Sequence, residues 1–473
     1  MKVNKQVDVL IVGAGISGVD AACRLTQRCP GKSFVVIEAR ERIGGTWDLF
    51  RYPGVRSDSD MYTLGFPFRP WRSAEAIVGG EAIRQYVEET AREFGVFDKI
   101  RFDTRVRSAS WSSADSRWTV ETNRGVFSCR FLYLASGYYD YAKGHRPEWP
   151  GEAEFKGRIV HPQFWPDDVG FAGKNVAVIG SGATAVTLVP AMAKEAARVT
   201  MVQRSPSYVV AAPGRDGMAK WFPAWLIRWK HILLTILLFG RARRRPERVA
   251  QWIRDKAREA LPTGYPVERD FSPNYAPWDQ RLCLIPDGDL FEAISAGKVA
   301  VATGEIERFV PEGLKLKSGE TIAADVVVTA TGLNMRLLGG IELHVDHELI
   351  RAPEHLIYKG MMLSGVPNLF VAFGYTNASW TLRADLTARS VCRLLKRMDS
   401  LGRTVVVATP PGELVRRPVM ELTSGYVSRA AAVLPGQGDR QPWHVPQHYV
   451  KDLVNMTFGR IDQDLNFEPR SVT

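Results

Sequence analysis

Short, continuous runs of apolar residues that end in glycine turns occur twice along the chain. One run covers residues 7–12 and leads into a glycine-rich turn, a helical pattern and a second apolar run at 34–38. The same order begins again with the apolar run at 176–179. Apolar runs of this kind are typical of strands that helices cover on both faces. The pattern therefore predicts an α/β protein with two Rossmann-like dinucleotide-binding domains.

The first glycine turn carries the fingerprint of a nucleotide site. Gly13, Gly15 and Gly18 satisfy GxGxxG between a predicted strand and a predicted helix. Glycines at these positions allow a tight turn, the approach of a pyrophosphate to the backbone and close packing of helix on strand. Glu38 ends the second strand, where a carboxylate accepts hydrogen bonds from a ribose 2′-hydroxyl. The spacing predicts a dinucleotide site that recognises a free ribose.

The second turn differs at the end of its second strand. Gly180, Gly182 and Ala185 form the GxGxxA variant, but Arg204 and Ser205 stand where the first unit has its acid. An acid would repel a 2′-phosphate, whereas an arginine and a serine can bind it. The second site is therefore predicted to prefer NADPH to NADH. The alternative is an Arg204 that merely ends a strand and faces solvent.

One acid-ended and one arginine-ended unit together predict a flavin–NADPH oxidoreductase with FAD in the first domain. The stretches 131–139 and 325–334 are apolar strands that run into glycine turns, and they mark where the chain leaves and re-enters the FAD domain. The predicted FAD domain is split between residues 1–150 and 326–473, and the NADPH domain covers 151–325 with a helical insertion near 214–279.

Composition limits the partners. The net charge of +11 and the sequence pI near 9.4 favour anionic partners such as phosphorylated cofactors or acidic lipid. No nucleic-acid recognition motif accompanies this charge, so no nucleic-acid partner is expected. The five cysteines are scattered without a CxxC pair, which argues against a disulfide framework, a metal site or a redox-disulfide flavoenzyme. The first residues lack a signal-peptide layout, so a cytoplasmic protein is expected.

The segment 221–246 is strongly apolar and ends in a cluster of arginines. Its uninterrupted apolar part, 232–239, is far shorter than the roughly 20 residues that span a bilayer. Arg228, Lys230 and His231 interrupt it further. Two interpretations stay open. The segment is a helix buried in a helical subdomain, or it is an interfacial helix whose arginines face anionic headgroups at the inner face of the cell membrane.

Two long motifs lie around and between the glycine turns. Phe155, Gly157, His161 and Trp165, with the proline that follows, satisfy FxGxxxHxxxWP, and the stretch 44–58 fits [AG]GxWxxxx[FY]PGxxxD. On these motifs the chain resembles the type I Baeyer–Villiger monooxygenases, a branch of the class B flavin monooxygenases. Segments along its whole length, among them PWDQRLCLIPDGDLF and GYTNASWTL, resemble the subgroup that contains the ethionamide-activating monooxygenase.

The resemblance implies an enzyme that uses NADPH and O2. Its substrates would be hydrophobic ketones, which become esters, and small molecules with thioamide or thioether sulfur. Arg281 would be the catalytic cation over the flavin, and Asp58 its carboxylate partner. The family has a lysine before this arginine, but this chain has Gln280, so Arg204 is expected to carry more of the NADPH preference. A purely structural Arg281–Asp58 pair is the alternative.

The resemblance also gives the motif at 155–166 the role of a hinge and relay between domains, with His161 at its centre, and not that of a nucleophile. The residues predicted to bind the cofactors come from both turns and from the motif at 44–58. For FAD they are Gly13, Gly15, Ser17, Gly18, Glu38, Gly45, Thr46, Trp47, Arg56, Ser57, Asp58 and Val106. For NADPH they are Gly180, Ser181, Gly182, Ala183, Thr184, Ala185, Arg204 and Ser205.

Two other functions stay open. One is a flavin monooxygenase that oxygenates nitrogen or sulfur without forming esters, and a large yield of ester from a ketone would argue against it. The other is a basic flavoprotein at a membrane surface that senses NADPH, and substrate-stimulated O2 consumption would argue against it. The sequence leaves the physiological substrate and the oligomeric state open.

Overall fold

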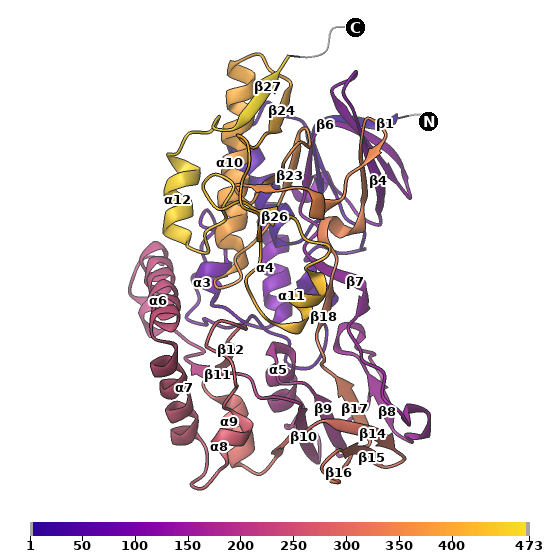
Figure 1. Cartoon of the computed structure of the whole chain (residues 1–473), viewed down its shortest axis with the longest axis vertical. Helices are drawn as coiled ribbons and strands as arrows, with labels where there is room; N and C mark the ends of the chain where they lie inside the picture. The colour runs from indigo at the N-terminus through magenta and orange to yellow at the C-terminus, as the bar shows by residue number, and fades with distance from the viewer. Residues whose placement is uncertain (1–2, 470–473) are drawn as a thin grey trace.

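The computed structural model describes residues 3–469, which form two units stacked along the long axis of the molecule (Figure 1). The first unit is built on the sheet that contains β1 (Val3–Val12), and the second on the sheet that contains β9 (Asn175–Ile179). Both strands lead into a glycine turn and a helix, and the apolar side chains at 7–12 of β1 and at 176–179 of β9 are buried because other elements cover both faces. The predicted α/β class with two Rossmann-like units is confirmed.

The first sheet combines a parallel centre with an antiparallel edge. In sheet order its strands are β20 (Glu348–Leu349), β19 (Glu342–Val345), β4 (Val106–Ser112), β5 (Arg117–Thr122), β6 (Gly125–Leu134), β1, β2 (Phe34–Ile37) and β3 (Ile100–Arg101), and β23 (Leu369–Val371) also pairs with β6. β1 pairs in parallel with β2 and β6. The carboxyl ends of these three strands therefore lie together beside the first glycine turn.

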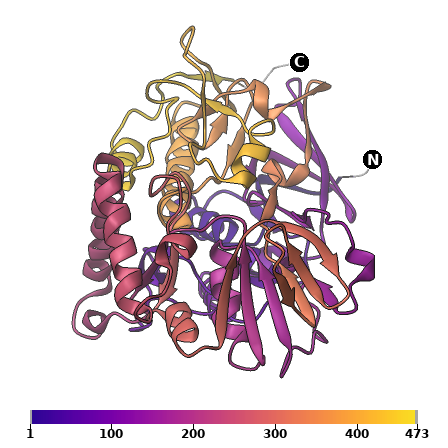
Figure 2. The same ribbon diagram turned by 60° about the horizontal axis from the view of Figure 1, so that its bottom comes forward.

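The second sheet is parallel throughout and comes forward in Figure 2. In sheet order its strands are β13 (Val299–Thr303), β10 (Arg198–Gln203), β9, β17 (Val326–Thr329) and β8 (Arg158–Val160). The sequence-based boundary after residue 325 is wrong for β17, because this strand pairs with β9 and β8. A short run of buried β-branched residues suits the centre of either sheet, so its pattern does not tell which one it joins.

The chain crosses between the units through two neighbouring strands. β7 (Tyr139–Gly144) leaves the first unit, and β18 (Leu333–Met335) returns to it. The two strands are antiparallel and pair with each other, with Gly144 opposite Leu333. This two-stranded ribbon is called the connector below.

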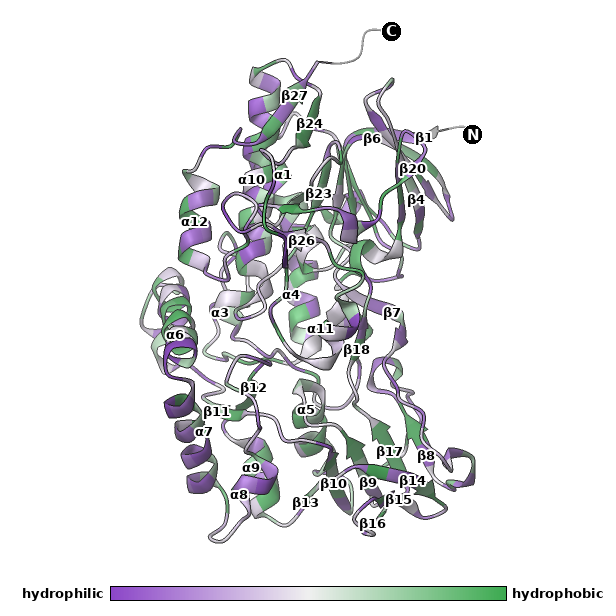
Figure 3. Ribbon diagram, viewed as in Figure 1, coloured by the Kyte–Doolittle hydropathy of each residue, from purple (hydrophilic) through white to green (hydrophobic). Residues whose placement is uncertain are grey.

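A helical region follows β10 within the second unit. It contains α6 (Ala224–Arg244), α7 (Pro246–Ala260) and α8 (Val267–Asp270). α6 lies along one edge of the molecule and reaches the first unit, where Arg228 donates hydrogen bonds to the carbonyl oxygens of Tyr62 and Gly65, each at 2.7 Å. Figure 3 shows that α6 is largely hydrophobic and that α7 is largely hydrophilic. None of the helices within residues 3–469 is both long and apolar enough to cross a membrane.

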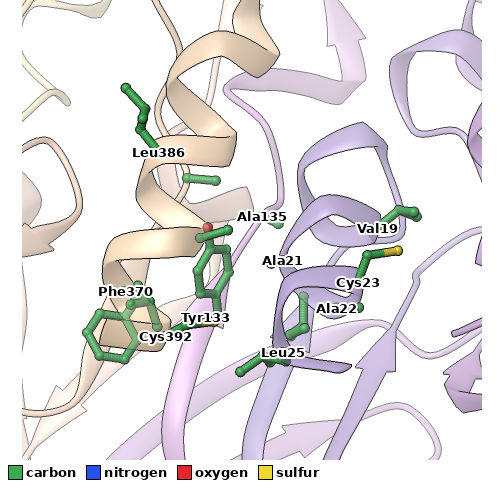
Figure 4. Packing of buried hydrophobic residues seen from close by; sticks show 14 of the residues in the cluster. Val19, Ala21, Ala22, Cys23, Leu25, Tyr133, Ala135, Phe370, Leu386 and Cys392 are labelled. Carbon is green, nitrogen blue, oxygen red and sulfur yellow. The ribbon is translucent and has the colours of Figure 1, made fainter. Parts of the chain in front are cut away.

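Three long helices pack together in one hydrophobic core against the first sheet. They are α1 (Ile16–Arg28), α4 (Gly80–Glu93) and α10 (Trp380–Ser400). Tyr133 of β6 lies between α1 and α10, close to Leu25 and Cys392, and all three are buried (Figure 4). Complete burial of an aliphatic or aromatic side chain contributes about 1.5–3 kcal/mol. All five cysteines are buried and free.

Shorter elements complete the two units. The helices are α2 (Thr46–Leu49), α3 (Met61–Leu64), α5 (Ala183–Met192), α9 (Asp289–Ser295), α11 (Gly425–Ala430) and α12 (Tyr449–Thr457). The strands are β11 (Val209–Ala212), β12 (Cys283–Pro286), β14 (Ile306–Val310), β15 (Gly313–Leu316), β16 (Thr321–Ala323), β21 (Ile357–Tyr358), β22 (Met362–Leu363), β24 (Val405–Ala408), β25 (Arg417–Pro418), β26 (Gly436–Gln437) and β27 (Leu465–Glu468).

Candidate active site

A cavity of about 460 Å³ lies where the two units meet. Its wall takes in the carboxyl ends of β1 and β2, the first turns of α5 and one side of α6. Rossmann folds bind their ligands beyond these strand ends. The predicted site residues in this wall are Gly13, Gly15, Ser17, Glu38, Gly45, Thr46, Trp47, Arg56, Asp58, Val106, Ala183, Thr184 and Arg281. The predicted residues outside it are Gly18, Ser57, Gly180, Ser181, Gly182, Ala185, Arg204, Ser205, Phe155, Gly157, His161 and Trp165.

The first glycine turn is packed as closely as a backbone allows. A Cβ atom on Gly18 would overlap the carbonyl oxygen of Gly13, and one on Gly13 would lie 2.6 Å from that of Ala135. Gly13 also has a φ of +104°, which favours glycine. Gly15 is the N-cap of α1 and lines the cavity. The positive end of α1 therefore faces the cavity, which is a suitable place for an anionic group.

Glu38 reaches back to this turn. Its two carboxylate oxygens accept hydrogen bonds from the backbone N–H of Ala14, at 2.7 Å, and of Arg40, at 2.9 Å. Burial raises the pKa of Glu38, although these N–H groups favour its charged form. The acid is thus held at the rim of the cavity by its own chain.

The second glycine turn is closed at Gly180, where a Cβ would lie 2.3 Å from the carbonyl oxygen of Ala330, but it is open beside Gly182. Among residues 3–469, no atom beyond the chain neighbours of Gly182 would lie within 4 Å of a Cβ there. Ser181 donates a hydrogen bond to the carbonyl oxygen of Ser205 at 3.0 Å, which joins the turn to the end of β10. Arg204 and Ser205 are exposed. Arg204 takes part in none of the ion pairs found within residues 3–469.

Arg281 and Asp58 meet in the cavity. Arg281 Nη1 lies 3.2 Å from Asp58 Oδ2. The arginine side chain lies deep in the molecule but is 31% exposed, because it faces the cavity. Its Nε and the Nε1 of Trp278 are buried without a hydrogen-bond partner within residues 3–469. Buried donors of this kind are normally satisfied, so a polar ligand would stabilise them.

Arg56 and Ser57 are predicted to bind FAD, but in the structure their side chains have other contacts. Arg56 lines the cavity, but its guanidinium donates two hydrogen bonds to the carboxylate of Asp289, at 2.5 and 3.2 Å. Asp289 begins α9, so this pair joins the first unit to the second. Ser57 is buried outside the cavity wall, and its hydroxyl has no partner within the described residues.

Sequence reasoning missed an aromatic wall next to Arg281. The ring of Tyr138 stacks on Trp380, with centroids 4.9 Å apart, and the hydroxyls of Tyr138 and Tyr139 are 2.7 Å apart. Trp380 Nε1 donates a hydrogen bond to the Ser17 hydroxyl at 2.7 Å. Burial raises the pKa of both tyrosines, so their hydroxyls keep their protons. The aromatic pair directly after the glycine turn at 135–137 was the available signal.

The motif around His161 lies against the connector. The ring of His161 packs directly on Gly144 of β7 and leaves no room for a side chain there. Gln163 donates a hydrogen bond through Nε2 to the carbonyl oxygen of Asp140 at 2.7 Å, and through its N–H to His161 Nδ1 at 3.2 Å. Burial lowers the pKa of His161, which favours the neutral ring. The histidine thus lies outside the cavity wall and in contact with the crossing between the units.

Comparison with known proteins agrees with this arrangement. The model of the pyridine nucleotide-disulphide oxidoreductase family matches residues 10–212, which include both glycine turns. The FAD-containing monooxygenase EthA of Mycobacterium tuberculosis is 50% identical over 481 residues, with 98% of each chain covered. The chain belongs to the FAD-containing monooxygenases. This membership confirms the predicted family and enzyme class. Within the described residues, the wall of the cavity contains no cysteine of this FAD-containing monooxygenase.

Two solved structures share the fold of this FAD-containing monooxygenase. Steroid monooxygenase bound to NADP is 23% identical with a TM-score of 0.77, and the match covers 98% of this chain and 100% of the other. Cyclohexanone monooxygenase bound to ε-caprolactone is 20% identical with a TM-score of 0.75 and the same coverage.

Proposed function

We propose that this FAD-containing monooxygenase uses NADPH and O2 to insert oxygen into hydrophobic ketones, which gives esters. Sulfur in thioamides or thioethers is the second substrate class. The observation that carries the proposal is a permanently charged Arg281 that faces the cavity beside Asp58. Negative charge grows on oxygen atoms during oxygen transfer to a carbonyl group, and a fixed cation lowers the energy of that state. The lactone bound to the similarly folded cyclohexanone monooxygenase supports this reaction class.

The first unit fits FAD. The tight turn at Gly13 and the start of α1 suit a pyrophosphate, and Glu38 suits a ribose hydroxyl. Gly45, Thr46, Trp47 and Val106 extend the wall on which the rest of the cofactor would lie. The N-terminus of α10, at Trp380, also reaches the cavity, and its positive end would stabilise negative charge on a flavin ring.

The second unit fits NADPH. The open space beside Gly182 and the first turn of α5 suit a pyrophosphate, and the exposed pair Arg204 and Ser205 suits a 2′-phosphate. Ala183 and Thr184 continue from this turn into the cavity. The nicotinamide end of NADPH would therefore enter the space that the flavin shares.

Bound FAD would supply the redox chemistry with NADPH and O2. The chain would contribute the charge of Arg281, which does not lose its proton at any physiological pH, and Asp58 would orient it. The hydroxyls of Tyr138 and Tyr139 hold their protons and can donate hydrogen bonds to a substrate oxygen. Leu238, Leu282 and Leu284 make another part of the wall apolar, which suits a hydrophobic substrate and excludes water.

We also propose that the motif around His161 acts as the hinge between the units. The contact of its ring with Gly144 and the bond from Gln163 to Asp140 support this role, because both touch the connector. In this interpretation His161 acts through packing and takes no part in the chemistry.

Product analysis tests the proposed function. Purified protein would be supplied with NADPH, isotopically labelled O2 and a panel of apolar ketones and thioethers, and the products identified by mass spectrometry. We expect a ketone to stimulate NADPH oxidation and to yield an ester with one labelled oxygen. Oxides of nitrogen or sulfur without any ester would indicate a heteroatom-oxygenating enzyme. NADPH oxidation that no substrate stimulates would indicate an NADPH-sensing flavoprotein.

A further inference from the structure

α6 lies at the edge of the molecule (Figures 2 and 3), and it carries apolar residues both on its buried side and on its exposed side. Ile227 and Ile232 on the inner side are buried. Leu233, Leu234 and Leu237 on the outer side are 50%, 52% and 53% exposed. A helix that is apolar all round is normally buried. No element within residues 3–469 covers the outer leucines, so this side needs another partner.

Each end of α6 carries residues that are typical of a membrane interface. Near its start, Trp221 is 84% exposed and Trp225 is 61% exposed, and Phe222 lies between them. At its end, Arg241, Arg244 and Arg245 are exposed and form no ion pair within residues 3–469. Their neighbour Arg243 pairs with Asp279. Tryptophan rings favour the headgroup level, and unpaired arginines favour anionic headgroups.

We propose that the outer side of α6 is a docking surface for an anionic membrane, on which the helix lies in the plane of the interface. The surface, called the α6 face, consists of Trp221, Phe222, Trp225, Leu226, Leu233, Leu234 and Leu237, with Arg241, Arg244 and Arg245 at its end. Charge decides between a membrane and a second copy of the chain. A second copy would bring a surface of the same sign with its own unpaired arginines, in a protein of net charge +11, whereas anionic lipid neutralises the arginines of the α6 face.

The same helix separates the α6 face from the cavity. Thr235 and Leu238 line the cavity, while the neighbouring Leu234 and Leu237 are exposed on the outside. Arg228 ties the helix to the first unit. A docked molecule would therefore hold its cavity one helix away from the lipid. An apolar substrate that is dissolved in the membrane would then have a short path to the site; this consequence rests on the proposed function, but docking itself does not.

Co-sedimentation of the full-length holoprotein with vesicles tests the docking. The vesicles are phosphatidylcholine alone, or phosphatidylcholine with phosphatidylglycerol. We expect binding to the anionic vesicles and weak binding to the neutral ones. The variant L233Q/L234Q/L237Q should lower the partition coefficient by roughly tenfold or more, because polar amides would replace the apolar side chains that enter the lipid. The variant R241Q/R244Q should lower it by roughly fivefold per arginine, and high salt should have a similar effect.

Matched controls keep the test specific. L401Q removes another exposed leucine, and R107Q/R351Q removes two exposed arginines far from α6, so both variants should bind anionic vesicles as the wild type does. Flavin content and NADPH oxidation with a water-soluble ketone show whether each variant is folded and active. A wild type that does not bind anionic vesicles, or a leucine variant that binds equally well, overturns the proposal. A lipid-free dimer that the leucine variant dissociates would assign the α6 face to a second copy.

Discussion

The two glycine turns have the same order of strand, turn and helix, but they hold their helices differently. In the first turn a Cβ on Gly18 would overlap the carbonyl oxygen of Gly13. In the second turn the corresponding residue is Ala185, whose methyl group is accommodated and fully buried. The helix of the first unit therefore packs more closely on its turn. The same motif can thus be built with or without room for one methyl group. The residue at its last position, Gly18 or Ala185, shows which of the two arrangements is present.

The ends of the second strands differ in the same sense. Glu38 is buried and bonded to the backbone of its own turn, whereas Arg204 is exposed and its turn is open beside Gly182. A buried acid in the wall of a deep cavity suits a cofactor that remains bound. An exposed arginine at an open turn suits a cofactor that enters and leaves, as a reductant must in every cycle.

The largest effect is expected where the two units meet, at Arg281. The variant R281A should lower ester or sulfoxide formation by roughly 10²–10³-fold, because a preorganised partner for negative charge is lost. Flavin content and reduction by NADPH should remain, because they depend on the glycine turns. The reducing equivalents should appear as hydrogen peroxide, measured beside NADPH consumption. R281K keeps the charge and should retain more product; near-normal product from R281A would leave the arginine only a packing role.

Adding or removing one methyl group tests the difference in packing between the two turns. G18A must displace the backbone of Gly13 and should cost about 1–3 kcal/mol or more through overpacking, with loss of bound flavin. A185G makes the opposite change and should cost only about 1 kcal/mol through helix propensity, with flavin content unchanged. Thermal unfolding and the flavin released on denaturation measure both effects. Equal losses in the two variants would contradict the difference in packing.

The nucleotide preference should depend on Arg204. A charge-assisted hydrogen bond contributes about 1.5–3 kcal/mol, so R204A should raise the KM for NADPH by roughly tenfold or more and leave that for NADH nearly unchanged. R198A removes an exposed arginine at the other end of β10 and serves as the control. Equal losses toward NADH and NADPH would show that Arg204 does not meet the phosphate.

The smallest effect concerns pH and the contact of α6 with the first unit. His231 lies 2.9 Å from Asp216 and 3.5 Å from Asp60. Burial alone would lower the pKa of His231, but the two carboxylates outweigh it and raise the pKa above its usual value. Protonated His231 therefore stabilises the folded state. This stabilisation is fully present below the pKa of histidine in the unfolded chain, about 6.5, and is lost as pH rises through the higher pKa of His231 in the folded state.

Unfolding of H231Q and wild type at several pH values measures this effect. The difference in free energy of unfolding should be larger near pH 6 than near pH 9, by roughly 1 kcal/mol or less. H347Q, which changes a histidine on an exposed turn, should follow the wild type. A difference that does not change with pH would show that His231 acts by packing alone.

Local patterns in the sequence were sufficient for the parts of the site that depend on spacing. The turns at Gly13 and Gly180 and the acid at Glu38 could be placed because each follows a strand directly. Tyr138, Trp380 and the α6 residues in the wall could not, because their meeting depends on tertiary packing of distant segments. The assignment of β17 failed for the same reason, since a buried strand does not reveal its sheet partner.

The connector makes the second unit, in topological terms, a single very large loop of the first. Its two ends leave side by side, with Gly144 opposite Leu333 in one ribbon. Neighbouring strands lie about 4.8 Å apart, so a related unit whose ends are that close, and which keeps the contacts of Arg228 and Asp289 with the first unit, could replace the intervening chain. The second unit could thus be exchanged between related enzymes as a whole domain. Such an exchange would transfer the nucleotide preference of the second unit to the recipient enzyme. Because β7 and β18 pair with each other, both connections would bend together. The second unit would then rotate relative to the first about a single axis.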